Sequence, residues 1–150
     1  MKTAIASDHA GIVLKDEIRG WLREHGYDVD DLGPTNTTSV DYPDFAAAVA
    51  RGVSTGTYAR GVLICGSGIG MSITANKFRG VRAALCANEF VARMARSHND
   101  ANVLCLGARV LGVDMAVGIV KEFFSTEFSE GRHRRRVDKI LEIEKTKNQI

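Results

Sequence analysis

Short apolar runs alternate with stretches of helical spacing along almost the whole chain, and no other feature limits the possible folds as strongly. The apolar runs are typical of buried strands and occupy Lys2–Ser7, Tyr27–Leu32, Arg60–Cys65, Val81–Cys86 and Asn102–Leu106. The intervening stretches are predicted helices, over Gly11–His25, Pro43–Thr55, Met71–Phe78, Asn88–Ser97 and Val113–Phe124. Strands that alternate with helices at short intervals pair in parallel, with helices on both faces of the sheet. The sequence therefore predicts an α/β fold with a doubly wound, Rossmann-like parallel sheet of five strands in the order 2-1-3-4-5.

A further helix is predicted at the C-terminus, over Arg132–Ile150, where Val137, Ile140 and Leu141 share one face among many charges. We expect this helix to dock on the chain's own body or on a partner. No repeat or interdomain linker interrupts the pattern, so residues 1–150 form a single predicted domain. A chain of this length buries roughly 70% of its unfolded surface, enough for a core that needs neither disulfides nor a structural metal.

The composition excludes several classes of protein. Lys and Arg number 20 against 18 Asp and Glu, and a formal charge of +2 does not support nucleic-acid binding. No run approaches the ~18 apolar residues of a membrane span, and the first residues lack the charged-then-apolar pattern of a signal peptide. Three cysteines cannot pair completely, and they have no close His or Cys neighbour of the kind that a zinc site needs. We therefore expect a cytoplasmic protein with free thiols, no metal site and no membrane or nucleic-acid partner.

Two polar segments are predicted to meet at one edge of the sheet. Asp8 and His9 follow the first strand, whereas Cys65 and a glycine-rich loop follow the third. In the predicted order the chain reverses direction between strands 1 and 3, and ligands of such folds bind in the crevice beyond the carboxyl ends of these strands. The topology alone therefore predicts the binding site at this crevice.

The glycine-rich loop consists of Gly66, Ser67, Gly68, Ile69 and Gly70 and leads directly into a helix. Glycines let the backbone approach a ligand closely, and N–H groups aimed at one point together with a helix N-terminus attract an anion. The loop has no Lys-Ser/Thr pair, as a Walker loop requires, and it does not follow the first strand, as a dinucleotide fingerprint does. The pattern indicates either an anion site outside both nucleotide classes or a purely structural turn.

Cys65 lies at the junction of the third strand and this loop, where nearby N–H donors favour the thiolate form. Its thiol is a candidate base or nucleophile, and the alternative is a small buried hydrophobic residue, which is the expectation for Cys86 and Cys105. A cysteine phosphatase needs an arginine six positions after the cysteine, but Met71 stands there. That class is therefore excluded.

Other residues can carry chemistry but also have simpler interpretations. His98 is predicted in a loop or at a helix end, either as a general acid or base or as a surface residue. Arg132 and Arg136 fall on one helical face and either bind a phosphate together or belong to a solvated charge run. Tyr42, in Asp41-Tyr42-Pro43-Asp44, is suited to sugar hydroxyls.

Taken together, six separated motifs resemble those of the B-type ribose-5-phosphate isomerases, in order and over nearly the whole chain. They are Ser7-Asp8-His9-Ala10-Gly11, Asp41-Tyr42-Pro43, Ile64-Cys65-Gly66-Ser67-Gly68-Ile69-Gly70, Ala75-Asn76-Lys77, Ser97-His98-Asn99-Asp100-Ala101-Asn102 and Gly131-Arg132-His133. That family, which also contains allose-, galactose- and tetrulose-phosphate isomerases, interconverts aldose and ketose phosphates without a metal. The resemblance implies an isomerase without a cofactor.

The resemblance also implies a role for each candidate residue. Cys65 would be the base that moves a proton between carbons 2 and 1 through a cis-enediolate, and His98 would open the furanose ring. The backbone from Gly66 to Gly70 would hold the enediolate, with hydrogen bonds from the side chains of Ser67 and Asn99. The remaining substrate-binding residues would be Asp8 and His9, Tyr42, and the phosphate-binding arginines Arg109, Arg132 and Arg136. Because family members are dimers or tetramers with sites at a subunit interface, some of these groups would come from a neighbouring chain.

Departures from the family pattern narrow the expected branch. One branch places a glutamate base just after the glycine loop, where this chain has Met71, so the resemblance implies the cysteine branch. The catalytic groups all stand in one chain, which implies a homo-oligomer, although dimer and tetramer stay open. We expect a ribose-5-phosphate/ribulose-5-phosphate isomerase of the pentose phosphate pathway. One alternative is an isomerase of a six- or four-carbon sugar phosphate, and the other is a phosphate- or nucleotide-binding module without catalysis. Arg134 and Arg135 have no predicted role.

Overall fold

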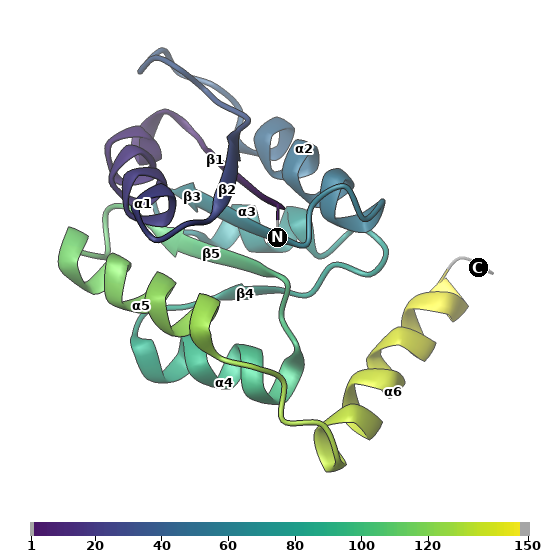
Figure 1. Ribbon diagram of the computed structural model, residues 1–150. Helices are drawn as coiled ribbons and strands as arrows, with labels where there is room; N and C mark the ends of the chain where they lie inside the picture. The colour runs from purple at the N-terminus through teal and green to yellow at the C-terminus, as the bar shows by residue number, and fades with distance from the viewer. Residues whose placement is uncertain (1, 148–150) are drawn as a thin grey trace.

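The computed structural model describes residues 2–147, and its centre is a five-stranded sheet in which every strand pair is parallel (Figure 1). The strands are β1 (Lys2–Ser7), β2 (Asp28–Asp31), β3 (Arg60–Cys65), β4 (Ala83–Leu85) and β5 (Val103–Gly107). The α/β fold class that the alternating pattern predicts is therefore confirmed.

The observed strand order, β2-β1-β3-β5-β4, corrects the predicted order 2-1-3-4-5, because the last two strands are exchanged. β5 is buried along its whole length and pairs with β3, from Gly61 opposite Val103 to Cys65 opposite Gly107. β4 has three residues, none of them buried, and pairs with β5. A fully apolar strand gains most from an interior position, whereas a short, partly exposed strand is suited to the edge. The reversal of chain direction between β1 and β3, on which the predicted crevice depends, is preserved.

Helices cover both faces of the sheet (Figure 1). One face carries α1 (Ile12–Glu24), α4 (Glu89–Asn99) and α5 (Val113–Ser125), and the other carries α2 (Tyr42–Ser54) and α3 (Ile69–Ala75). Alternate residues of β3 enter opposite cores, because successive strand side chains point to opposite faces; Ile64 packs under α1 and α5, and Cys65 lies on the side of α2 and α3. Within residues 2–147, every helix is too short or too polar to cross a bilayer.

Two helix boundaries near the candidate residues differ from the prediction. α3 begins at Ile69, not Met71, so the helix starts inside the glycine loop. α4 ends at Asn99 and not at Ser97, which places His98 in its last turn, where the alternative prediction was a loop. Both changes extend a helix toward candidate site residues, so these residues have a more regular backbone than the sequence indicates.

The C-terminal helix α6 covers Arg132–Lys147, and the last predicted residues, 148–150, lie outside the described part of the chain. Its first half packs against α4, where Val137 is buried, and in its second half Glu144 accepts a hydrogen bond from the Gly80 N–H at 2.8 Å. Figure 1 shows α6 in yellow beside the rest of the fold, and Ile140 and Ile143 are 45% and 62% exposed. These two side chains line a groove of about 530 Å³ whose opposite wall includes Val81 and Ala83.

Candidate active site

The carboxyl ends of β1, β3 and β5 meet around Cys65. The Asp8 N–H, directly after β1, donates to the Ile64 carbonyl of β3 at 3.0 Å. On the other side, the Ala108 N–H, directly after β5, donates to the Cys65 carbonyl at 2.8 Å. These two bonds fix the segments that follow three neighbouring strands, at the edge of the sheet where the crevice is predicted.

At this edge, the glycine loop turns tightly around the Cys65 thiol. Gly68 has φ +78, a left-handed conformation that glycine adopts without strain, and its N–H donates to Cys65 Sγ at 3.1 Å. The Ile69 N–H, at the start of α3, donates to Ser67 Oγ at 3.3 Å. Since the thiol is buried and accepts a backbone N–H, Cys65 is held at the base of the loop.

Two exposed side chains from distant segments flank the loop. The ring of Tyr42, from the start of α2, lies so close to Gly70 that a Cβ there would stand 2.5 Å from ring atoms. Arg109, after β5, lies beside Gly66, where a Cβ would be 3.4 Å from the arginine Cδ. The structure thus brings Tyr42 and Arg109 to the glycine loop, and the close approach of the Tyr42 ring requires glycine at position 70.

Asp8 and His9 lie at the β1 side of the crevice. One carboxylate oxygen of Asp8 accepts from the N–H groups of Ala10 and Gly11, at 2.9 and 3.2 Å, and so caps the short 3-10 helix η1 (His9–Gly11). The Nδ1 atom of His9 accepts from the Val40 N–H at 3.2 Å, which in the neutral ring leaves the proton on Nε2. The Val40 contact therefore fixes the imidazole so that Nε2–H is available as a donor.

The second set of predicted residues lies at the opposite edge of the sheet. His98 and Asn99 end α4, and the chain then enters β5 at its amino end, Val103, whereas Cys65 lies beside the carboxyl end, Gly107. Four residues of strand span about 13 Å, and this length of β5 separates the two sets along the strand direction. Arg132 and Arg136 accompany His98, because α6 begins next to the end of α4. One chain therefore does not bring the two sets together. We call them the first candidate half-site, around Cys65, and the second candidate half-site, around His98.

His133 is a residue of the second half-site that the sequence reasoning missed. Its ring stacks on that of His98, with centroids 4.1 Å apart and planes 7° from parallel. Burial lowers the pKa of His133, and the nearby His98, Arg132 and Arg136 lower it further. A signal was present in the sequence, because His133 precedes the buried Val137 by four residues and so shares its helical face.

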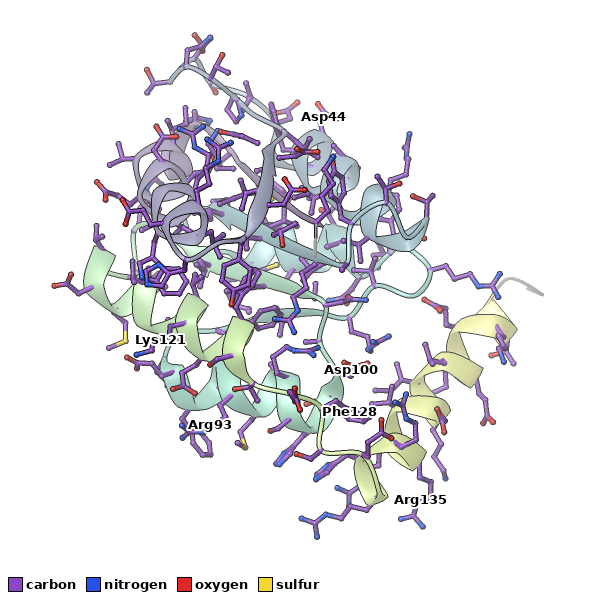
Figure 2. The ribbon with its side chains drawn as sticks, in the orientation of Figure 1. Asp44, Arg93, Asp100, Lys121, Phe128 and Arg135 are labelled. Carbon is purple, nitrogen blue, oxygen red and sulfur yellow. The ribbon has the colours of Figure 1, made fainter. Side chains whose placement is uncertain are left out.

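Arg134, for which the sequence suggests no role, has a structural one. Its guanidinium donates to both carboxylate oxygens of Glu130, at 2.8 and 3.1 Å, and lies over the Phe128 ring at 4.7 Å. The hydrogen bond from Arg134 lowers the pKa of Glu130. Arg134 therefore stabilises the start of α6, whereas Arg135 is exposed and points away from the body (Figure 2).

The other two thiols are buried in the core, as predicted. Cys105 is fully buried in β5 and Cys86 almost fully so. Burial raises the pKa of Cys86 to about 12 and that of Cys105 well above its usual value. Both are therefore neutral thiols. Within the described residues, 2–147, neither side chain forms a hydrogen bond with the glycine loop.

Replacing Gly68 by alanine is expected to damage both the fold and the loop. A Cβ there would lie 2.9 Å from the backbone carbon of Leu106, and the left-handed conformation adds its own strain. We expect the free energy of unfolding to fall by at least about 2 kcal/mol, measured by denaturant titration. Gly20→Ala in α1 is the control, because no atom lies within 4 Å of that Cβ and alanine there should stabilise by about 0.5–1 kcal/mol. Equal effects of the two variants would contradict this account of Gly68.

Comparisons with known proteins bear on the family and the fold. A family model described as Ribose/Galactose Isomerase matches residues 3–140. Ribose-5-phosphate isomerase B of Escherichia coli is 44% identical over 147 residues, which are 98% of this chain and 99% of the relative. The structure of ribose-5-phosphate isomerase B from Clostridium thermocellum has a TM-score of 0.95 at 53% identity, with 97% of this chain and 99% of that chain covered.

A second solved structure, ribose-5-phosphate isomerase B from Mycoplasma genitalium with bound ribulose-5-phosphate, has a TM-score of 0.94 at 44% identity. It covers 96% of each chain. These relatives match this chain from end to end, so the likeness extends beyond a shared fold or a single motif. The resemblance stated from the sequence motifs is confirmed: the chain belongs to the ribose/galactose isomerase family and is an isomerase.

Proposed function

We propose that this chain interconverts ribose 5-phosphate and ribulose 5-phosphate through a cis-enediolate. The observation that carries the proposal is the Cys65 thiol, which accepts the Gly68 N–H at the base of a glycine loop in the sheet crevice. The names of the relatives support the substrate, since the Escherichia coli protein is a ribose-5-phosphate isomerase B and the Mycoplasma genitalium structure holds ribulose-5-phosphate.

In the proposed reaction, Cys65 is the base. Its thiolate removes the proton from C2 of the open-chain aldose, the C2–H electron pair forms the C1=C2 bond, and the charge moves to the C1 oxygen. The thiol then returns the proton to C1, and the proton of the C2 hydroxyl passes to the C1 oxygen, so that C2 becomes the ketone and C1 carries the hydroxyl. The substrate neither gains nor loses electrons overall, so the proposed reaction needs no redox cofactor.

The glycine loop is proposed to stabilise the enediolate. The first N–H groups of a helix have no partner within the helix, and those of α3 begin in this loop. Donors aimed at charge that develops only along the reaction path lower the barrier without tightening substrate binding. The side chains of Ser67 and Asn99 would add hydrogen bonds, with Asp8 and Tyr42 at the sugar hydroxyls.

We further propose that a second copy of the chain completes each site. The expected phosphate-binding groups divide between the half-sites, with His9 and Arg109 in the first and Arg132 and Arg136 in the second. A symmetric dimer brings the first half-site of each chain to the second half-site of the other. Exposed apolar side chains at each edge support such contact: Ile69, Ile73 and Leu85 near the glycine loop, and Ile140 and Ile143 on α6. We expect this homo-oligomer to act in the cytoplasm.

The direct test is ketose formation from ribose 5-phosphate in a buffer that contains a chelator. Allose 6-phosphate and erythrose 4-phosphate are assayed in parallel, because the size of the pocket decides between sugars of different length. The proposal expects fast conversion of the pentose. Conversion of the hexose or the tetrose alone would keep the isomerase and change the substrate.

The role of His98 is tested with His98→Asn and two assays. As the acid that protonates the ring oxygen, His98 is needed for furanose ribose 5-phosphate, and its loss should slow ketose formation by about 10²–10⁴. Deuterium exchange from D₂O into C1 of ribulose 5-phosphate, which is open-chain because its C5 oxygen carries the phosphate, needs only the base. We expect exchange to stay within a few-fold of wild type, and equal losses in both assays would argue against ring opening by His98.

A further inference from the structure

The segment that ends α4 has an unusual backbone for a residue with a side chain. Asp100 follows His98 and Asn99 at the C-cap of the helix with φ 46, the left-handed region where glycine is common and where, among residues with a side chain, Asn and Asp are tolerated best. Glycine would end the helix at lower cost. An aspartate at this position is therefore expected to make contacts through its carboxylate that glycine could not make.

The carboxylate joins two arginines from different elements. Arg96, one helical turn earlier in α4, donates to Asp100 Oδ1 at 2.9 Å and to the Ala101 carbonyl at 2.6 Å. Arg82, just before β4, donates to Asp100 Oδ2 at 3.0 Å. Arg96 is 8% exposed and packs over the Phe123 ring, so its guanidinium is fixed on the body of the protein. The two ion pairs together hold Asp100 against both α4 and the sheet.

Arg82 also holds the backbone that carries the second half-site. Its guanidinium donates to the Asn99 carbonyl at 3.2 Å and to the Asp100 carbonyl at 2.8 and 3.0 Å. Its own backbone N–H donates to Asn102 Oδ1 at 2.8 Å, at the entry to β5. The end of α4 is therefore bound at its carbonyls as well as through Asp100, where a helix terminus otherwise frays.

We propose that Asp100, bridged by Arg82 and Arg96, is a positioning residue that fixes the imidazole of His98 for ring opening; this rests on the proposed function of His98. A proton donor must be held within about 0.5 Å of its productive position. The His133 ring fixes one face of the imidazole by stacking, and the clamp fixes the backbone two residues after it. Figure 2 shows Asp100 at the end of α4 that faces α6.

The test uses Asp100→Asn, which keeps a residue that tolerates the left-handed conformation but removes the charge that both arginines bind. The readout is the ratio of ketose formation from ribose 5-phosphate to deuterium exchange into C1 of ribulose 5-phosphate, measured on the full-length enzyme. We expect this ratio to fall by about tenfold, as for a partial loss of general acid catalysis. The ratio should fall less for Arg82→Lys, which keeps the charge, than for Arg82→Ala.

Arg93→Gln is the matched control. Arg93 lies in α4, as Arg96 does, and its guanidinium is 3.4 Å from the Glu122 carboxylate of α5. Removing this ion pair should leave the ratio unchanged. Figure 2 shows Arg93 on the outer side of α4. In a His98→Asn background, Asp100→Asn should cause no further fall, since Asp100 acts through that imidazole. A merely stabilising ion pair would lower the melting temperature and leave the ratio intact.

The proposal is overturned if Asp100→Asn and Arg82→Ala fold and keep the wild-type ratio, or if the fall persists without His98. If Asp100→Asn does not fold, the two Arg82 variants decide, because the lysine variant keeps the ion pair. A wild-type enzyme without any isomerase activity would instead overturn the proposed function. The two failures are therefore distinguishable.

Discussion

Cys65→Ala is expected to lose almost all turnover while it still binds the sugar phosphate. General base catalysis contributes about 10²–10⁴ to a rate, and no other thiol is within reach of the loop, because Cys86 and Cys105 are buried in the core. The side chain makes one hydrogen bond, to the Gly68 N–H, so its loss should not displace the loop. Ketose formation and deuterium exchange at C1 of ribulose 5-phosphate should fall together, because both require the base. Ribulose 5-phosphate affinity, measured by calorimetry, should change only a few-fold.

The control for this variant is Cys86→Ala, which removes a thiol of the same size from the opposite face of the sheet. It should keep kcat even if its melting temperature falls, since the Cys86 side chain contributes packing and a hydrogen bond to the Ala84 carbonyl at 3.7 Å, both away from the glycine loop. Cys65→Ser is a more conservative substitution. It should also lose activity, because the weakly acidic hydroxyl is a poor base at neutral pH. Substantial exchange at C1 by folded Cys65→Ala would mean that another group removes the proton.

The sequence predicts the fold well where one physical pattern dominates. β1 and β3 have the predicted ends, because each is a continuous apolar run bounded by polar or glycine residues. The exchange of β4 and β5 was missed, because periodicity does not encode which strand pairs with which. The residue types did carry a hint: Val103, Leu104 and Leu106 are typical of a core strand, whereas three of the five residues between the polar Arg82 and Asn88 are alanines.

The candidate site was predicted in part, for reasons that differ between its two halves. Asp8 and Cys65 meet because parallel strands place their carboxyl ends at one edge, a rule that needs no distances. The contact of Tyr42 with Gly70 depends on the path of a long loop, which no local pattern fixes. The place of His98 followed from the fold itself: a helix between parallel strands returns to the amino edge, so its last turn lies far from the Cys65 end.

Mixing two inactive variants is expected to restore activity if each site combines residues from two chains. In a dimer of one Cys65→Ala chain and one His98→Asn chain, one site keeps both Cys65 and His98, and the other has lost both. Random reassociation of equal amounts, after denaturation and refolding together, makes half of the dimers mixed. With one working site of two in these, the pool should reach about a quarter of wild-type activity toward ribose 5-phosphate, far above either variant alone.

The decisive control carries both changes in the same chain and mixes that double variant with wild type. Every mixed dimer then has one site without Cys65 and one without His98, so only the remaining wild-type dimers work. Reassociation should therefore lower the activity of this pool from about a half to about a quarter of that of the same total amount of wild-type enzyme. If Cys65 and His98 of one chain acted together, the first mixture would stay inactive and the second would keep its half. The separation of about 13 Å along the strand direction within a chain, set by β5 lying between the two half-sites, is the reason to expect the opposite.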